Sequence, residues 1–159
     1  MGDDDNKERT RARNTAYRCL TYRPRSRAEI IQKLQDKEFK EEIIEAVLAD
    51  LARLGYVNDR QFADQWAQSR IRLRGFGRRR IEQELRNKGI DREIIREVFA
   101  GIYIGETEIE TAKLVAGKKI NTMKSIDRET RRRRLAGFLE RKGFSFEIIR
   151  TVLRDADGN

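Results

Sequence analysis

The chain has 159 residues, of which 40% are charged and 38% hydrophobic, with a single proline; this composition is typical of a helical, strongly solvated protein and excludes a membrane-spanning one. It contains no histidine and one cysteine, Cys19, which excludes histidine-based proton transfer, histidine-ligated or cysteine-rich metal sites and an internal disulfide. The net charge of +9 favours a polyanionic partner such as nucleic acid. Because the N-terminus lacks the apolar stretch of a secretory signal, we expect a cytoplasmic protein.

Hydrophobic residues at helical spacing predict an all-α protein of three tandem three-helix units. We expect a flexible N-terminus over 1–10 and units over 11–55, 56–101 and 102–159. The first helix of each unit is predicted at about 11–22, 59–74 and 107–118. Because the connections at 55–59 and 101–105 are short, neighbouring units should pack against each other in an elongated, curved array.

The second and third helices of the units repeat in phase. The segments AEIIQKLQDKEFKEEIIEAVL (28–48), RRIEQELRNKGIDREIIREVF (79–99) and RRLAGFLERKGFSFEIIRTVL (133–153) align with Leu34, Leu85 and Leu139 at one position. Each segment reads as a helix, a break at Lys-x-(Phe/Ile) and a second helix. Such an in-phase repeat is typical of arrays in which each unit is marginal alone and packs on its neighbour.

Capping residues mark the predicted helix ends. The expected N-caps are Ser26, which forms a capping box with Glu29, and Asp91, Asp127 and Ser145. Gly89 and Gly143 stand where a helix ends in a left-handed residue, a conformation that glycine adopts without strain. Glu38 occupies this position in the first unit, so we expect that turn to close differently.

Two motifs carry a resemblance to a known family. The run GYVNDRQFADQWAQSR (55–70) is similar to Gly-Tyr-x-Asp-Asp-x-x-Phe-Ala, with Asn58 in place of the more usual acid. The run GFGRRRIEQELRNKGI (75–90) fits Gly-(Tyr/Phe)-Gly-x-x-Arg-Ile-x-x-Glu-Leu-x-x-Lys-Gly-Ile. Over about residues 12–154 the chain resembles the RecX family of bacterial regulatory proteins. The resemblance implies that it binds the RecA recombinase and its filament on single-stranded DNA, and inhibits ATP hydrolysis and strand exchange.

Arginines are concentrated in the segment SRIRLRGFGRRR (69–80), which contains no acid. Phe62, Trp66, Ser69 and Leu73 are predicted to form the buried stripe of the preceding helix. Arg78, Arg79 and Arg80 should occupy the first turn of the next helix, where free amides already carry positive partial charge. We interpret this turn as a phosphate site, because a bound anion would offset the repulsion. The alternative is a solvated face on which acids such as Glu82 or Glu84 pair with the arginines.

The repeat extends the predicted site. Arg132, Arg133 and Arg134 align with the first arginine triplet, so both sets should lie on one side as a basic track for DNA phosphates or an acidic filament surface. Phe76 would either stack on a base or dock into a partner if exposed, or pack beneath the helix start. The predicted binding residues are Arg70, Arg72, Arg74, Phe76, Arg78, Arg79, Arg80, Arg132, Arg133 and Arg134.

Catalysis is not supported by the sequence, because no phosphate loop of the GxxxxGK[ST] kind occurs and histidine is absent. We therefore expect a binding protein without cofactor or metal, a monomer that contacts the RecA filament, single-stranded DNA and also double-stranded DNA, but no membrane. Two alternatives remain open. One is a helix-turn-helix transcription factor, and the other is a metal-dependent nuclease built on scattered carboxylates.

Overall fold

The computed structural model describes residues 3–102 and 107–157, and all regular structure in these ranges is helical, as predicted. The first unit contains α1 (Asp3–Tyr22), α2 (Arg27–Gln35) and α3 (Glu41–Arg53). The second contains α4 (Asp59–Ser69), a π-helical turn η1 (Arg70–Arg74), α5 (Arg78–Asn87) and α6 (Arg92–Ile102). The third contains α7 (Thr107–Asn121), α8 (Arg128–Lys142) and α9 (Phe146–Asp157). No helix in the described ranges is long and apolar enough to cross a bilayer.

The N-terminal end of α1 differs from the prediction. Residues 3–10, expected to be flexible, form the first turns of this helix. Its side chains reach the rest of the unit: the guanidinium of Arg9 lies 2.6 Å from the carboxylate of Asp50 on α3, and the ammonium of Lys40 lies 3.3 Å from Asp5. These contacts and the acidic residues near the helix N-terminus favour the longer helix. The connection predicted at 101–105 lies largely outside the described residues.

The predicted helix caps form. The Ser26 hydroxyl accepts a hydrogen bond from the Glu29 amide, and the Glu29 carboxylate accepts one from the Ser26 amide, which completes the capping box. Asp127 accepts from the amide of Thr130. These bonds satisfy first-turn amides that have no partner within their own helix.

The turn at Glu38 closes in the same way as its counterparts, contrary to expectation. Glu38 takes a left-handed φ of 60°, close to the 74° of Gly89. The Phe39 amide donates to the carbonyl of Leu34, and the Ile90 amide makes the equivalent bond in the second unit. The first unit therefore keeps the turn at the cost of backbone strain, which for a non-glycine residue is about 1–2 kcal/mol.

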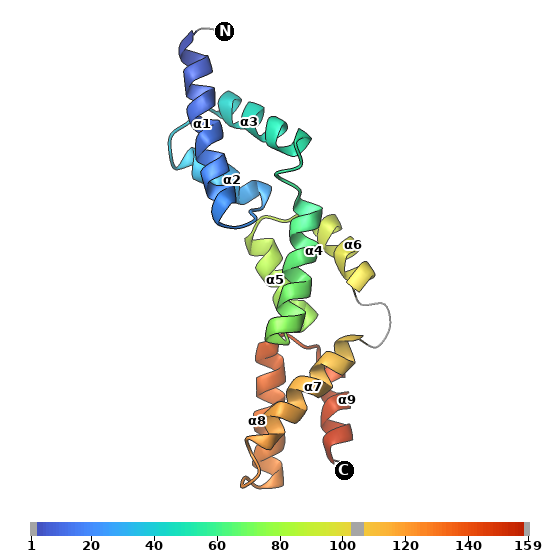
Figure 1. Cartoon of the computed structure of the whole chain (residues 1–159). Helices are drawn as coiled ribbons and strands as arrows, with labels where there is room; N and C mark the ends of the chain where they lie inside the picture. Colours follow the sequence, from blue (N-terminus) through green and yellow to red (C-terminus); the bar gives the residue numbers. More distant parts are fainter. Residues whose placement is uncertain (1–2, 103–106, 158–159) are drawn as a thin grey trace.

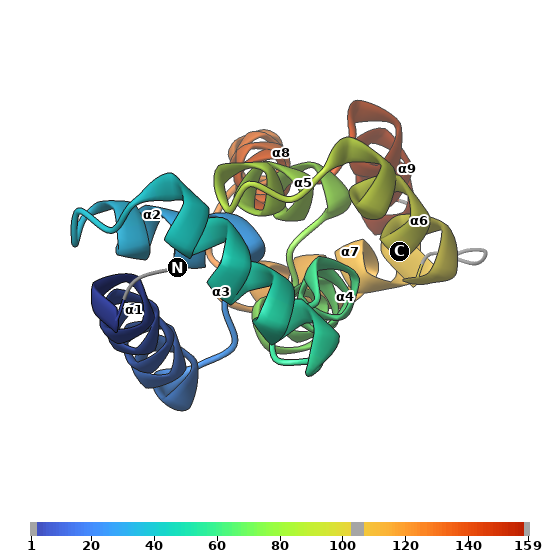
Figure 2. The ribbon, with the colours of Figure 1, turned by 90° about the horizontal axis from the view of Figure 1, so that it is seen from above.

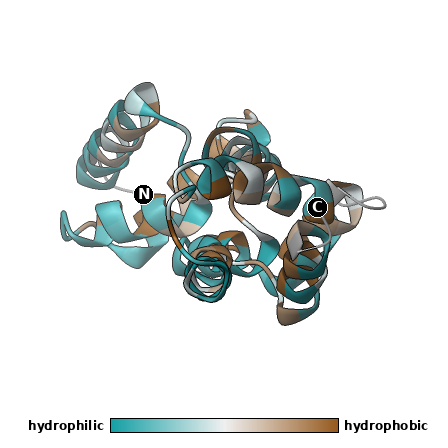
Figure 3. Ribbon diagram, turned by 90° about the horizontal axis from the view of Figure 1, so that it is seen from below, coloured by the Kyte–Doolittle hydropathy of each residue, from teal (hydrophilic) through white to brown (hydrophobic). Residues whose placement is uncertain are grey.

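Each unit has its own hydrophobic core. Pairs of buried alanines occur on the first helices at Ala12 and Ala16, Ala63 and Ala67, and Ala112 and Ala116. The large side chains that they pack with include Ile30, Leu34 and Leu48 in the first unit, Ile81, Leu85 and Phe99 in the second, and Leu135, Leu139 and Phe144 in the third. Hydrophobic and hydrophilic stretches accordingly alternate along the helices (Figure 3).

The three units follow one another in an elongated array, and their second helices, α2, α5 and α8, lie along one side of it (Figure 1). In the view along the array, α5 overlies α8 (Figure 2). The C-terminus of α8 meets the N-terminus of α5, where the amides of Gly77 and Arg79 donate to the carbonyls of Lys142 and Gly143 at 2.8 and 3.1 Å. This contact joins the second and third units through backbone atoms.

The first and second units meet in the same manner. The hydroxyl of Ser26, at the N-terminus of α2, donates to the carbonyl of Lys88, at the C-terminus of α5, at 2.6 Å. Beside this contact, the Arg27 amide donates to the Asp59 carboxylate at 2.7 Å. The Arg78 amide makes the matching bond to Glu108 at the other junction. Both junctions thus place the end of one second helix against the start of another.

Candidate nucleic-acid interface

The first turn of α5 is not an open phosphate site. The three arginines do begin this helix, as predicted. However, the amides of Gly77 and Arg79 are bonded to α8, and the amide of Arg78 donates to the carboxylate of Glu108 at 2.9 Å. Burial raises the pKa of Glu108, although the bond from the Arg78 amide acts in the opposite direction. The interpretation of these amides as an anion site is therefore wrong, because the third unit already supplies their acceptors.

Three of the predicted arginines lie within ion-pair distance of carboxylates: Arg70 and Arg80 pair with Glu84, the latter at 3.8 Å, and Arg78 pairs with Glu82. The Nε of Arg70 lies 2.7 Å from Glu84, and its guanidinium lies over the Trp66 ring at 4.0 Å from the centroid. The Nε of Arg78 lies 2.6 Å from Glu82, one turn along α5. At these positions the alternative of pairing with nearby acids holds, and the carboxylates compete with a phosphate for the guanidinium groups.

Phe76 is buried, with 9% of its surface exposed. The guanidinium of Arg80 lies 3.8 Å from its ring centroid and donates to the carbonyl of Arg141 at 3.0 Å. Lys142 approaches the same ring at 5.2 Å. Phe76 therefore packs under the start of α5, and the proposed stacking of a base on it is wrong.

The two arginine triplets point in several directions. Consecutive residues of an α-helix are turned by roughly 100°, so each triplet spreads around its helix. Arg79 and Arg132 nonetheless line one shallow hollow between α8 and α9, with a volume of about 430 Å³ and Glu140 on its wall. Arg133 and Arg134 are exposed on α8 and form no ion pair within the described residues. The structure thus brings Arg79 and Arg132 together but not the two whole triplets, and the arginine flank is defined as these two residues with the neighbouring exposed Arg133 and Arg134 of α8.

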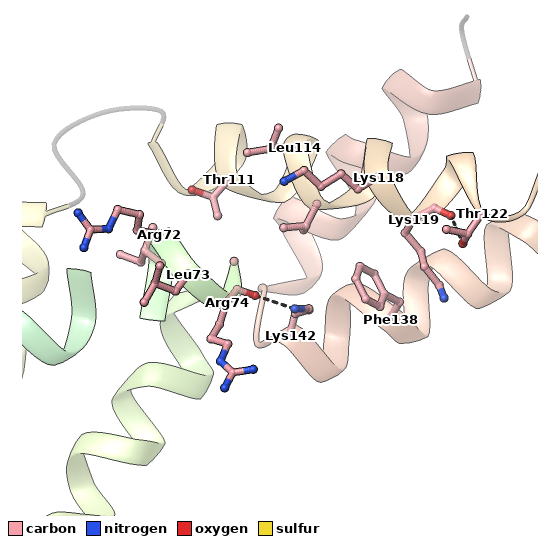
Figure 4. Close-up of a pocket in the computed structure, with 13 residues that line it drawn as sticks. Arg72, Leu73, Arg74, Thr111, Leu114, Lys118, Lys119, Thr122, Phe138 and Lys142 are labelled. Carbon is pink, nitrogen blue, oxygen red and sulfur yellow. Dashed lines mark hydrogen bonds between the residues drawn. The ribbon is translucent and has the colours of Figure 1, made fainter. Parts of the chain in front are cut away.

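A second basic surface is the groove between η1, α7 and α8 (Figure 4). It has a volume of about 590 Å³. Its cations are Arg72, Arg74, Lys118, Lys119 and Lys142, and no carboxylate is found among the described residues that line it. The Lys142 ammonium donates to the Arg74 carbonyl at 2.6 Å. Burial lowers the pKa of Lys142, and the charges of Arg80 and Arg74 lower it further.

Leucines also line this groove, against the prediction for Leu73. Leu73 was assigned to the buried stripe with Phe62 and Trp66, but 70% of its surface is exposed. The reason is that η1 is π-helical, which shifts the side chains away from 3.6-residue spacing. Lys118 and Lys119 of α7 and Lys142 of α8 are not among the predicted binding residues, because only the fold brings the two helices together. The two adjacent lysines near the C-terminus of α7 are the available signal in the sequence.

The first unit carries an equivalent groove between α1 and α2, with a volume of about 720 Å³. When α1 and α7 are aligned on their buried alanine pairs, Arg18 and Lys118 occupy the same position. The aligned repeat of the second and third helices likewise places Lys37 and Lys142 at one position. The cations that line it are Arg11, Arg18, Arg25, Lys33 and Lys37, and its described lining contains no carboxylate. The first and third units thus present similar basic grooves.

In the second unit the corresponding space is filled. Trp66 occupies the position of Val115, and its indole nitrogen donates to Glu84 at 2.9 Å. Lys88 lies over the same ring at 4.3 Å from the centroid. With the Arg70–Glu84 pair, these side chains close the groove between α4 and α5. Open basic grooves are therefore found in the first and third units.

At the junction between the first and second units a carboxylate pairs with the lysine that ends α5, whereas the lysine that ends α8 has no such partner among the described residues. Glu29 lies 2.6 Å from Arg23 and 3.3 Å from Lys88. Burial raises the pKa of Glu29, but hydrogen bonds from Arg23 and the Ser26 amide and the charges of Lys88 and Arg23 outweigh it and lower the pKa to about 2. Arg80 occupies the equivalent position at the second junction, where Lys142 accordingly has no carboxylate partner among the described residues.

We expect Glu29→Gln to destabilise the chain near neutral pH and to lose this effect in acid. Because the pKa of Glu29 in the folded chain lies below its ordinary value of 4.5, the ionised carboxylate contributes stability above about pH 4.5, and this contribution disappears as the pH falls through 2. Urea unfolding at several pH values measures the difference between variant and parent. Glu45→Gln, on the exposed face of α3, is the control, and a Glu29→Gln difference that stays constant with pH would contradict the prediction.

Groups of three or more His, Cys, Asp or Glu side chains able to hold a metal ion are absent from the described part of the chain. The carboxylates near the candidate surfaces serve as partners of arginines or of backbone amides, as Glu84 and Glu108 do. The arrangement is suited to binding anions through cations on the arginine flank and in the grooves of the first and third units.

Comparisons with known proteins cover almost the whole chain. Models of the first, second and third three-helix domains of RecX match residues 12–51, 58–98 and 106–153. The regulatory protein RecX of Streptomyces coelicolor is 39% identical over 145 residues, which is 91% of this chain and 77% of that protein. The one from Amycolatopsis mediterranei is 36% identical, over 91% and 82%. The crystal structure of RecX from Lactobacillus salivarius superposes with a TM-score of 0.86 at 25% identity, over 97% and 99% of the two chains.

Proposed function

Because this chain belongs to the RecX family of regulatory proteins, we propose that it binds the RecA recombinase and its nucleoprotein filament and inhibits ATP hydrolysis and strand exchange. The observation that carries the proposal is the match of three family domains, in order, along one chain. The relatives are named regulatory proteins, and we propose that this chain acts by binding and catalyses no reaction of its own.

The basic surfaces support a polyanionic partner. We assign contact with the DNA backbone to the flank of Arg79, Arg132, Arg133 and Arg134, since exposed guanidinium groups bind phosphates without reading sequence. Single-stranded DNA in the filament is the proposed ligand, and double-stranded DNA offers the same chemistry. We propose that one chain acts as a monomer. A helix-turn-helix transcription factor is not favoured, because three RecX domains account for the chain.

The test adds the full chain to the cognate recombinase on single-stranded DNA and follows ADP release. We expect ATP turnover to fall progressively as the chain approaches stoichiometry with the recombinase. Adding the chain before or after filament assembly separates a block of filament growth from disassembly. The recombinase without DNA and the heat-denatured chain are the controls. Unchanged turnover in stoichiometric excess of the chain would refute the proposal.

A further inference from the structure

The groove between η1, α7 and α8 has features that contact with DNA does not explain. Leu73 and Leu114 are 70% and 62% exposed, although each is a large aliphatic side chain. They rise from two of the elements that border the groove, η1 and α7, and line it together with the cations (Figure 4). A sugar-phosphate backbone offers only the small C–H faces of its sugars to two leucines, whereas exposed apolar groups ringed by charge are typical of protein-binding sites.

The aromatic ring in this groove is not offered to a base. The ammonium groups of Lys119 and Lys142 each lie over Phe138 at 5.5 Å from the ring centroid. A ring covered by cations is not available as a stacking platform, which is how single-stranded nucleic acid uses aromatic side chains. The groove therefore has charge for an anion but lacks an exposed ring for a nucleobase.

The charge of the groove favours an anionic occupant. Arg72, Arg74, Lys118 and Lys119 form no ion pair with any described residue. Lys142 donates to a carbonyl and lies over two aromatic rings, without a carboxylate partner among the described residues. Guanidinium groups pair with carboxylates in a bidentate geometry, and ammonium groups act as point charges for the same anion. A peptide that carries both carboxylates and aliphatic side chains matches the cations of the groove and its two exposed leucines.

We propose that this groove docks an acidic peptide segment that bears at least one large aliphatic side chain and belongs to a protein partner. The segment's carboxylates pair with the five cations, and its aliphatic side chain packs between Leu73 and Leu114. A volume of about 590 Å³ lies in the range of pockets that enclose small ligands or side chains. The inference rests on the proposed function in that it assigns the protein contact to this groove and leaves the DNA contact to the arginine flank.

The test measures binding of the full chain by fluorescence anisotropy with three labelled probes. They are a short peptide of glutamate and leucine, the same peptide with serine in place of leucine, and a single-stranded oligonucleotide. We expect the glutamate–leucine peptide to bind more tightly than the glutamate–serine peptide. The double variant Leu73→Ser/Leu114→Ser should weaken its binding by about tenfold and leave oligonucleotide binding unchanged.

Leu54→Ser is the matched control, since Leu54 is 50% exposed at the end of α3, away from the groove. Equal affinity for the two peptides, or no effect of the double variant, overturns the proposal. If the double variant weakens the oligonucleotide instead, the groove is a nucleic-acid site. If it abolishes self-association in light scattering, the occupant is a second copy of the chain. Because these assays contain no recombinase, their failure is distinguishable from failure of the ATP-turnover test.

Discussion

Replacing Gly77 by alanine is expected to lower the free energy of unfolding by about 1–3 kcal/mol, although its φ of −79° is one that alanine adopts readily. The added Cβ would lie 2.5 Å from the carbonyl carbon and oxygen of Gly143 and 2.6 Å from the nitrogen of Phe144. These are backbone atoms, which cannot rotate away, so the second and third units must move apart. Urea unfolding followed by far-UV circular dichroism measures the loss.

Gly117→Ala is the matched control. Gly117 lies within α7, and a Cβ there meets nothing within 4 Å, so the change should stabilise the chain by up to about 1 kcal/mol. Amide hydrogen exchange localises the effect, since the Arg79 amide should lose protection in Gly77→Ala when its bond to Gly143 breaks. A Gly77→Ala protein as stable as its parent would show that the junction does not hold the units together.

The second large effect concerns DNA binding by the arginine flank. Replacing Arg79, Arg132, Arg133 and Arg134 by alanine is expected to reduce the slope of log K against log salt concentration by up to about 3 for single-stranded DNA. Each cation that neutralises a phosphate contributes roughly 0.7 to that slope through release of counterions. Anisotropy of a labelled oligonucleotide at a series of salt concentrations gives the slope.

A variant with the same loss of net charge separates local contact from overall charge. Arg53, Arg60, Arg96 and Arg154 lie outside the flank and are paired with acids on the surface. Their replacement by alanine should change the slope much less. Equal slopes for the two quadruple variants would mean that the flank has no special role and that only net charge attracts DNA.

Local features of the fold were predictable from the sequence, and the outcome at Ser26 and Asp127 shows why. A capping residue acts on amides two or three positions away, so its role can be recognised in a short window. The repeat of apolar residues likewise identified the helices around Leu85 and Leu139, because burial follows helical spacing. The left-handed turn at Glu38 was not predicted, because tertiary contacts impose this conformation on a non-glycine residue.

The candidate binding surfaces depend on contacts between segments that are distant in the sequence, and the spacing of hydrophobic residues does not reveal such contacts. Arg70 is neutralised by Glu84, fourteen positions later, and the first turn of α5 is occupied by the carbonyls of Lys142 and Gly143. The π-helical turn that exposes Leu73 has no sequence signature in the spacing of its neighbours. The aligned repeat does contain one signal of the site, because Arg80 occupies the position of Glu29 in the first unit. This exchange replaces a negative side chain with a positive one at the second junction.

The open grooves of the first and third units lie on one chain, with a closed unit between them. A partner that presents one suitable segment per molecule fills a single groove when it is isolated. When copies of that partner are held side by side at the matching spacing, the second contact becomes intramolecular, and avidity raises the apparent affinity by about 10²–10⁴. Under the proposed docking, such a chain would distinguish an assembled polymer from its free subunit without any contact that is unique to the polymer.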